Sequence, residues 1–336
     1  VMEHLFALIK FDHVTYRHPG TSETAPPALN DINIAIEAGE WVAIVGANGS
    51  GKSTFARHCN ALLLPTSGGV LIDGMNTSQS INLPQIRSRI GMVFQNPEDQ
   101  IVATIIEEDT AFGPENLAVK SAEIRERVFN ALGRVKMLDE KERPPHLLSA
   151  GQKQRVALAG VLAMQPECII FDESTAMLDP RGRQDVLAEM QALHERGITV
   201  LFITHFMEEA MRADRVLVLN QGNLVFDDSP KVLFADLELL RRCGLEQPIT
   251  ILLLNEMRKL HPLLANIPND FEKVLSGIPA YTGDFRLSEG NHAPQHAEPL
   301  ISIENLSHPY MPGTPLEHPS LFDISFEVGK GEAHGL

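Results

Sequence analysis

The sequence has little positive charge, few cysteines and no long apolar segment. Its 28 lysine and arginine residues are outnumbered by 44 acidic residues, which gives a formal net charge of −16. A surface of that sign repels phosphates, so direct binding to nucleic acid is disfavoured. The three cysteines, Cys59, Cys168 and Cys243, lack metal-ligand spacing and indicate reduced thiols in the cytosol.

No segment is typical of a targeting or membrane-spanning element. The N-terminal VMEHLFALIK lacks a basic start and a small-residue cleavage site, so we interpret it as a first strand. No apolar run approaches the roughly 20 residues of a spanning helix. We therefore expect any contact with a membrane to be made through partner proteins.

Alternating strand-like and helical segments predict an α/β fold. β-rich runs end at Trp41 to Val45, just before a glycine-rich loop and a predicted helix from Lys52 to Leu64. The mostly helical block between Phe112 and Ser149 predicts an inserted subdomain. The alternation itself predicts a largely parallel sheet. The predicted strands are Leu8 to Val14, Ile32 to Ile36, Ile90 to Phe94, Cys168 to Phe171, Thr199 to Ile203 and Val216 to Leu219.

The C-terminal part contains helices, a linker and a partial repeat of the N-terminus. Amphipathic stretches run from Val232 to Cys243 and from Ile249 to Leu260, and a linker rich in proline, glycine, asparagine and histidine covers 277–298. Residues 299–336 then match the beginning of the chain at a constant offset of 292, as in Ile9 with Ile301 and Leu29 with Leu321. Two readings stay open, namely a cut-short second domain and a full-length tail that pairs onto the sheet.

The segment GANGSGKST satisfies the phosphate-loop pattern GxxxxGK[ST] between a strand and a helix. Its glycines let backbone N–H groups surround phosphate oxygens, and the following helix adds a positive dipole end. Lys52 suits the β- and γ-phosphates, while the Ser53 hydroxyl suits Mg²⁺. The predicted phosphate-binding residues are Gly46, Ala47, Asn48, Gly49, Ser50, Gly51, Lys52, Ser53 and Thr54.

Two carboxylates follow a buried apolar run in CIIFDE. An unpaired charge there is costly unless a cation or substrate uses it. Asp172 suits the Mg²⁺ shell, and Glu173, facing the other way at a strand end, suits a general base for the attacking water. Together with the phosphate loop, these residues predict ATP and Mg²⁺ as ligands.

The segment LSAGQKQR closely resembles the LSGGQ signature of ATP-binding cassette (ABC) ATPases, with Ala150 in place of a glycine. The resemblance implies an ABC nucleotide-binding domain with an antiparallel β subdomain, a mainly parallel core sheet and a helical signature subdomain. It also implies that Ser149, Gly151 and Gln152 contact ATP held on the phosphate loop of another domain in a head-to-tail dimer. Ser149 also suits the N-cap of a helix.

Further family elements match in register. Gln95 matches the family glutamine that touches Mg²⁺ or water. Asp179 in STAMLD matches the D-loop, and His205 in ITH matches the histidine that senses the γ-phosphate. The resemblance also implies an aromatic residue that stacks on adenine. Tyr16 and His18 are both candidates, and Tyr310 stands opposite His18 in the repeat.

Within that family, FQNPEDQIV and EEDTAFGPEN resemble the ATPases of energy-coupling factor transporters, which import vitamins or cobalt and nickel ions in bacteria. The resemblance implies a peripheral protein on the cytoplasmic face of the cell membrane, with a transmembrane scaffold and a small substrate-binding membrane subunit as partners. The implied domains are a cassette over 5–228 with a helical subdomain at about 100–165, a helical extension over 229–276, the linker, and the truncated start of a second cassette over 299–336.

Three other functions compete with this interpretation. They are the ATPase of another ABC importer, an ABC ATPase of DNA repair or translation, and a nucleotide-binding regulator without catalysis. The acidic charge and the short helical insert disfavour the second. The complete set of catalytic residue types disfavours the third.

Overall fold

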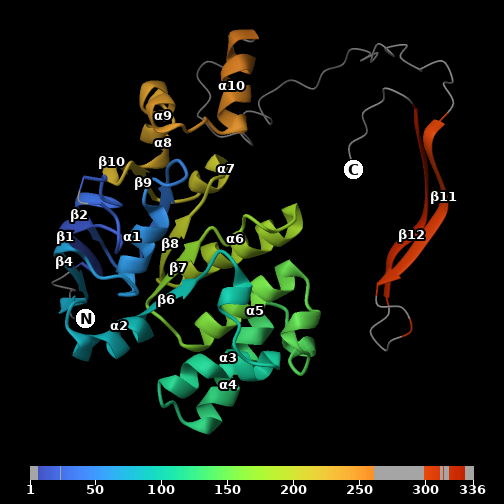
Figure 1. Cartoon of the computed structure of the whole chain (residues 1–336), viewed down its shortest axis with the longest axis horizontal. Coiled ribbons are helices and arrows are strands. Elements are labelled where there is room, and N and C mark those ends of the chain that lie inside the picture. The colour runs from blue at the N-terminus through green and yellow to red at the C-terminus, as the bar shows by residue number, and fades with distance from the viewer. Residues whose placement is uncertain (1–6, 23, 261–298, 311–312, 314–317, 330–336) are drawn as a thin grey trace. The chain divides into compact units, whose positions relative to one another are not determined.

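Two β-sheets and the helices around them make up the first of two compact units, residues 1–277, and a β-hairpin belongs to the second, residues 278–336 (Figure 1). The computed structural model describes residues 7–22, 24–260, 299–310, 313 and 318–329. The predicted linker over 277–298 lies outside these ranges. Within them, no helix is both long and apolar enough to cross a bilayer.

The central sheet has six strands in the order β10-β9-β3-β8-β7-β6. Its five neighbouring strands from β9 to β6 pair in parallel, and only β10 is antiparallel. The sequences of β3, β7 and β8 are buried along their whole length, as parallel strands covered on both faces require. The strands are β3 (Trp41–Val45), β6 (Ile90–Val93), β7 (Cys168–Asp172), β8 (Thr199–Ile203), β9 (Arg215–Asn220) and β10 (Asn223–Asp228).

A second, antiparallel sheet has the order β2-β1-β4-β5. Buried and exposed residues alternate along much of β1, because one face packs on the core and the other meets solvent. The strands are β1 (Ile9–Tyr16), β2 (Leu29–Ile36), β4 (Ser67–Ile72) and β5 (Met75–Asn76). The prediction of an antiparallel subdomain beside a mainly parallel sheet is confirmed.

Helix α1 (Lys52–Cys59) packs between the two sheets. Phe55 stacks on Phe11 of β1 with ring centroids 4.5 Å apart, and both side chains are fully buried. The helix ends at Cys59, earlier than the predicted Leu64, since the next residues turn and Ala61 takes a positive φ of 55°. This packing fixes the start of α1 against the end of β3.

Three helices, α3 (Ile106–Asn116), α4 (Ser121–Arg134) and α5 (Ala150–Ala163), pack on one another (Figure 1). They form a helical block that begins before the predicted Phe112 and continues past the predicted Ser149. Helix α5 begins with a reciprocal capping box, in which Ser149 accepts from the N–H of Gln152 and the Gln152 side chain accepts from the N–H of Ser149. The predicted N-cap is therefore confirmed. Helices α2 (Leu83–Arg89), α6 (Pro180–His194) and α7 (Met207–Ala210) complete the cover of the central sheet.

The predicted single stretch from Val232 to Cys243 is wrong as one helix. It forms α8 (Pro230–Leu233) and α9 (Leu237–Cys243), because the Asp236 side chain accepts from the N–H of Leu239 and starts a new helix. Helix α10 (Ile249–Leu260) has the predicted bounds. Ile251 of α10 is buried in the hydrophobic cluster of the central sheet, so the extension shares the core of the first unit.

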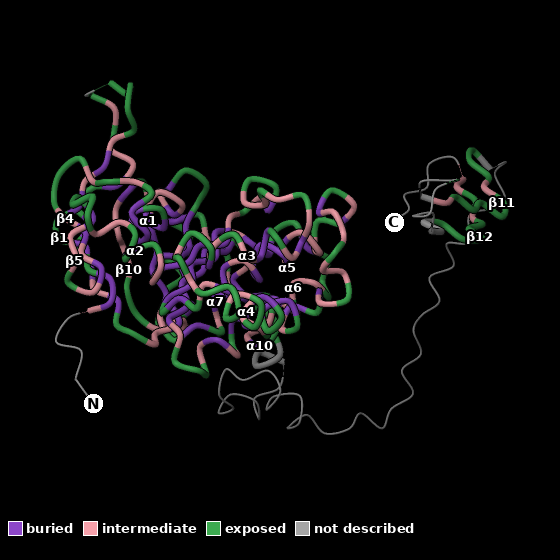
Figure 2. The backbone as a smooth tube through the Cα atoms, turned by 90° about the horizontal axis from the view of Figure 1, so that it is seen from below, coloured by how far each residue is buried: buried purple, intermediate pink, exposed green. Residues whose placement is uncertain are grey.

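The described residues of the second unit form an antiparallel pair, β11 (Pro299–Tyr310) and β12 (His318–Gly329). None of the residues classified by burial in this hairpin is buried, and Figure 2 shows them in green and pink. A two-stranded hairpin is marginal in water without a packed face.

Candidate functional site

The glycine-rich loop leaves the carboxyl end of β3 and enters α1, and two of its glycines are required by close contacts. A Cβ at Gly46 would lie 2.2 Å from the carbonyl oxygen of Leu219, and one at Gly51 would lie 2.5 Å from that of Ala28. Both glycines also have positive φ angles, 150° and 106°. The loop is therefore set by β9 and by the chain entering β2. The other predicted residues follow along it: Ala47, Asn48 and Gly49 are exposed, Ser50 is buried, and Thr54 is half-buried in α1.

The Lys52 side chain lies over the loop that precedes it. Its Nζ donates to the carbonyl oxygens of Gly46 at 2.9 Å and Ala47 at 3.1 Å. Burial lowers the pKa of Lys52, while the charges of Glu173 and Asp172 oppose that shift. An ammonium among carbonyls and carboxylates is placed to attract phosphate oxygens.

Ser53 and Asp172 join the loop to the end of β7. The Ser53 hydroxyl donates to Oδ1 of Asp172 at 2.9 Å. Burial raises the pKa of Asp172, and the bond from Ser53 works against that rise. Both side chains line a cavity of about 420 Å³ together with Gln95, Asn96, Asp99 and Arg57. Hydroxyl, amide and carboxylate oxygens are the donors that Mg²⁺ prefers, so these residues fit the predicted ion.

Glu173 meets the two other predicted catalytic residues. Its Oε2 accepts from Nε2 of Gln95 at 2.8 Å, and its Oε1 lies 2.7 Å from Nε2 of His205. The backbone of Glu173 has a φ of 50°, so this residue adopts a left-handed conformation just after β7 and not the extended conformation assumed for a strand end. A left-handed turn after β7 directs this carboxylate, and the N–H of Glu173 donates to the carbonyl of Ile203 on β8.

The two candidates for adenine stacking have different surroundings. Tyr16 is buried, with its ring edge-on to His58 at 4.8 Å and to His18 at 5.1 Å. His18 is exposed in the loop after β1. The ring with free surface is therefore that of His18.

The signature residues lie in a different pocket from the phosphate loop. Ser149 and Gly151 at the start of α5 line it together with Asp179, whose Oδ1 caps α6 by accepting from the N–H of Gly182 at 2.7 Å. Gln152 is held in the capping box of α5. This pocket and the cavity at Ser53 share no lining residue, so the signature residues and the phosphate-loop residues of this chain line two separate pockets.

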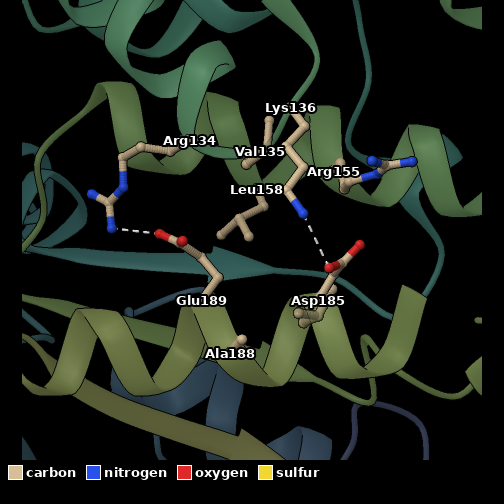
Figure 3. A pocket seen from close by; sticks show the side chains of 9 residues that line it. Arg134, Val135, Lys136, Arg155, Leu158, Asp185, Ala188 and Glu189 are labelled. Carbon is tan, nitrogen blue, oxygen red and sulfur yellow. Dashed lines mark hydrogen bonds and ion pairs between the residues drawn. The ribbon is translucent and has the colours of Figure 1, made fainter. Parts of the chain in front are cut away.

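Beside the signature pocket, ion pairs connect the end of α4 to α6. Figure 3 shows Arg134 directed at Glu189 and Lys136 directed at Asp185, with Arg155 of α5 on the same pocket. The Nζ of Lys136 is 3.3 Å from Oδ1 of Asp185. Because each pair joins the end of α4 to α6, the pairs help fix the helical block against α6. Lys136, Arg155 and Asp185 also line the signature pocket.

One buried residue near the site was missed by the sequence analysis. Oε2 of Glu209 on α7 accepts from the hydroxyls of Thr175 at 3.1 Å and Thr204 at 2.5 Å. Its other oxygen lies 3.7 Å from Nε of Arg183. The only signal in the sequence was its spacing, since Glu209 follows Phe206 by three residues on an otherwise apolar helical face.

Comparisons with known proteins agree with this geometry. Residues 29–176 match the protein family described as ABC transporter. The energy-coupling factor transporter ATP-binding protein EcfA1 of Caldanaerobacter subterraneus subsp. tengcongensis is 51% identical over 253 residues, which cover 75% of this chain and 91% of that protein.

Two solved structures are similar in fold and sequence. The structure of cbiO1 from Clostridium perfringens, described as part of the ABC transporter complex cbiONQ, has a TM-score of 0.62 and 36% identity and covers 70% of this chain and 94% of that one. The dimeric ATP-binding cassette MJ0796, in a post-hydrolysis state bound to ADP and Pi, has a TM-score of 0.60 and 30% identity and covers 66% and 98%. Each match spans more than nine-tenths of the other protein.

Proposed function

Because the chain belongs to the family of energy-coupling factor transporter ATP-binding proteins, we propose that it binds and hydrolyses ATP to energise a membrane importer of vitamins or transition metal ions. The observation that carries the proposal is the position of Glu173. Its carboxylate is held by Gln95 and His205 and adjoins the Ser53–Asp172 pair. A carboxylate oriented by two partners beside a phosphate loop suits the activation of water.

Each residue of this cluster has a distinct role in the proposal. Lys52 and the loop amides would bind the phosphates, and Ser53, Asp172 and Gln95 would hold Mg²⁺, which would neutralise phosphate charge when bound. Glu173 orients and deprotonates the attacking water, and His205 contacts the γ-phosphate. His18 stacks on adenine, with Tyr16 as its edge-on support.

We propose that hydrolysis needs two cassettes in a head-to-tail dimer. The support is the separation of the phosphate-loop cavity from the pocket of Ser149, Gly151 and Asp179, because each ATP then needs one half from each domain. The similar MJ0796 cassette is a dimer with ADP and Pi. Closure of two such domains on ATP, and their release after hydrolysis, would move attached membrane helices.

The importer partners proposed are a transmembrane scaffold and a small substrate-binding membrane subunit on the cytoplasmic face of a bacterial membrane. The similar cbiO1 is described as part of a transporter complex. Gln95 and Glu98 lie in the segment between β6 and α3, where the scaffold would sense the state of the site. Glu98 is paired with Lys153 of α5, so a contact there reaches the signature helix.

The proposed domain organisation follows the same assignment. Residues 5–228 form the cassette, with the helical signature subdomain at about 100–165, and residues 229–276 form an extension whose described part, 229–260, packs on the cassette core. The assembly role of this extension is part of the proposal.

The test of catalysis uses the full chain with Glu173→Gln. ATP turnover should fall about 10²-fold or more, as for loss of a general base, while MgATP binding persists and an ATP-bound dimer accumulates. Glu167→Gln at the other end of β7 is the matched control and should turn over ATP like the parent. Unchanged turnover in Glu173→Gln would reject Glu173 as the base.

The test of transport is separate. The chain is co-expressed with the scaffold subunit of an energy-coupling factor transporter and captured in detergent with ATP and with ADP. Co-purification in either nucleotide supports the importer assignment. Failure in both rejects it while leaving the ATPase assignment intact.

A further inference from the structure

The hairpin β11–β12 repeats the pairing register of β1–β2. At the offset of 292, the pair Ile9 with Ile36 corresponds to Ile301 with Val328. The other four residue pairs between β1 and β2 also have counterparts that pair between β11 and β12. Lys10–Ala35 corresponds to Ser302–Glu327, Phe11–Ile34 to Ile303–Phe326, Val14–Ile32 to Leu306–Ile324, and Tyr16–Leu29 to His308–Leu321. Two unrelated hairpins would not share all of these pairings at one offset.

The irregularities of the first hairpin are repeated as well. His13 and Asp31 have φ angles of 49° and 51°, and their counterparts Asn305 and Asp323 have 49° and 50°. Positive φ outside glycine is uncommon, so two matched occurrences are informative. In addition, the N–H of Asp31 donates to the Thr15 hydroxyl at 3.1 Å, and the N–H of Asp323 donates to the Ser307 hydroxyl at 3.0 Å.

The apolar face is also repeated, although it is covered in one hairpin and open in the other. Val14 and Ile32 are 0% and 1% exposed, whereas Leu306 and Ile324 are 40% and 38% exposed. With the single exception of Tyr16, which His308 replaces, each buried apolar residue of the first hairpin has an apolar counterpart. The counterparts of Leu8, Ile9, Phe11, Val14, Leu29, Ile32, Ile34 and Ile36 are Leu300, Ile301, Ile303, Leu306, Leu321, Ile324, Phe326 and Val328.

One substitution pair preserves the volume of this face. Phe11 lies opposite Ile34, and the counterparts Ile303 and Phe326 lie opposite each other with the aromatic ring on the other strand. Directly opposed residues of antiparallel strands share a face, so the pair fills a similar space in both hairpins. Volume-conserving swaps of this kind are the ones that a packed core tolerates.

We propose that β11–β12 is the first hairpin of a second nucleotide-binding cassette, and that its open apolar face is the packing surface for that cassette's own strand and phosphate-loop helix. The occupant is identified by the first unit, where β4 pairs with β1 and Phe55 of α1 stacks on Phe11. This goes beyond ATP hydrolysis by the first cassette, since a tandem chain would carry its own dimer partner.

The experiment transplants the second hairpin into the first cassette. In the full chain, residues 9–36 are replaced by a copy of residues 301–328, which has the same length. The chimaera should remain soluble and unfold cooperatively, and its ATP affinity, read from nucleotide-dependent thermal shifts, should stay within about tenfold of the parent. A second chimaera has His308→Tyr in the transplanted copy only, which places a tyrosine where the parent has Tyr16. This second chimaera should be the more stable of the two.

Point changes identify the face. In the transplanted copy, the change that corresponds to Leu306→Asp, at the place of buried Val14, should abolish cooperative unfolding. The change that corresponds to Ser302→Asp, at the place of exposed Lys10, should not. At its native position in the otherwise unmodified chain, Leu306→Asp should leave ATP binding by the first cassette unchanged. Aggregation of both chimaeras, or equal tolerance of the two aspartates in the chimaera, overturns the proposal. ATP binding by the unmodified chain is measured in parallel, so a failure of the proposed ATPase function is seen separately.

Discussion

Glu209 connects the two loops that carry Glu173, the proposed general base, and His205, the proposed γ-phosphate contact, so removing Glu209 should affect both stability and turnover. The carboxylate accepts hydrogen bonds from Thr175, two residues after Glu173, and from Thr204, directly before His205. Glu209 is 3% exposed and lies near the Arg183 guanidinium. We therefore expect Glu209→Ala to loosen the placement of Glu173 and His205 relative to each other.

The magnitude follows from the groups left without an acceptor. The buried hydroxyls of Thr175 and Thr204 would lose their acceptor, and a buried donor left without a partner costs about 1–3 kcal/mol, so the loss of both bonds should cost roughly 2–6 kcal/mol. For a domain of this size, 1 kcal/mol shifts the melting temperature by about 2–4 °C, so Glu209→Ala should lower it by roughly 4–24 °C. Glu209→Gln retains an acceptor oxygen and should lose much less.

The difference in stability between Glu209→Gln and the parent should change with pH in one direction. Burial raises the pKa of Glu209, although the bonds from Thr204 and Thr175 oppose the rise. A raised pKa in the folded state means that the parent's contribution is fully present below the unfolded value of about 4.3 and is lost as pH rises through the folded value. The stability of Glu209→Gln relative to the parent should therefore improve as pH rises from about 4.3 through the raised pKa of Glu209 in the folded protein, and should be constant above it.

The assay combines thermal unfolding with steady-state ATP hydrolysis, measured well below the lowest melting temperature. Glu209→Ala should lower kcat about tenfold or more with little change in KM, because the Lys52 loop is untouched, and Glu209→Gln should restore most of it. Glu208→Gln, exposed and adjacent, is the control and should leave kcat unchanged. If Glu209→Ala melts like the parent and keeps its kcat, the positioning role of Glu209 is refuted.

Three further changes test other parts of the site. Asp172→Asn removes a carboxylate whose pKa is raised by burial, so without nucleotide it should melt above the parent at pH 8, with the gap closing as pH falls, and it should lose the Mg²⁺-dependent part of ATP stabilisation; the opposite pH trend would contradict this. Gly51→Ala should lower the melting temperature and abolish ATP binding because its Cβ would meet the carbonyl of Ala28, whereas Gly133→Ala in α4, with open space around it, should do neither. Ser149→Ala should cost about 1 kcal/mol as a lost N-cap and reduce ATP-dependent dimerisation in light scattering while single-chain ATP affinity persists; full dimerisation would remove Ser149 from the proposed interface.

Several features were predictable because their information is local in the sequence. The phosphate loop combines glycines, Lys52 and Ser53 between a strand and a helix, and the structure has that order. The capping box at Ser149 spans four consecutive residues. The repeat in 299–336 was visible at a constant offset, and the structure adds matching register and matching positive φ angles.

Other features depended on where the chain returns in space. The left-handed conformation of Glu173 differs from that of an extended strand end, and its partners Gln95 and His205 follow β6 and β8, which lie on either side of β7. The division of one predicted helix at Asp236 depended on a side-chain cap that competes with helical periodicity.

The sequence by itself determined the residue types of the site and their order, because a phosphate loop and a signature are contiguous motifs. Only the tertiary structure decided that Tyr16 is buried while His18 is exposed, that Glu209 connects two loops, and that the signature pocket is separate from the phosphate loop. The physical reason is that burial and long-range hydrogen bonds depend on strand order and packing, which bring together residues that no local pattern relates.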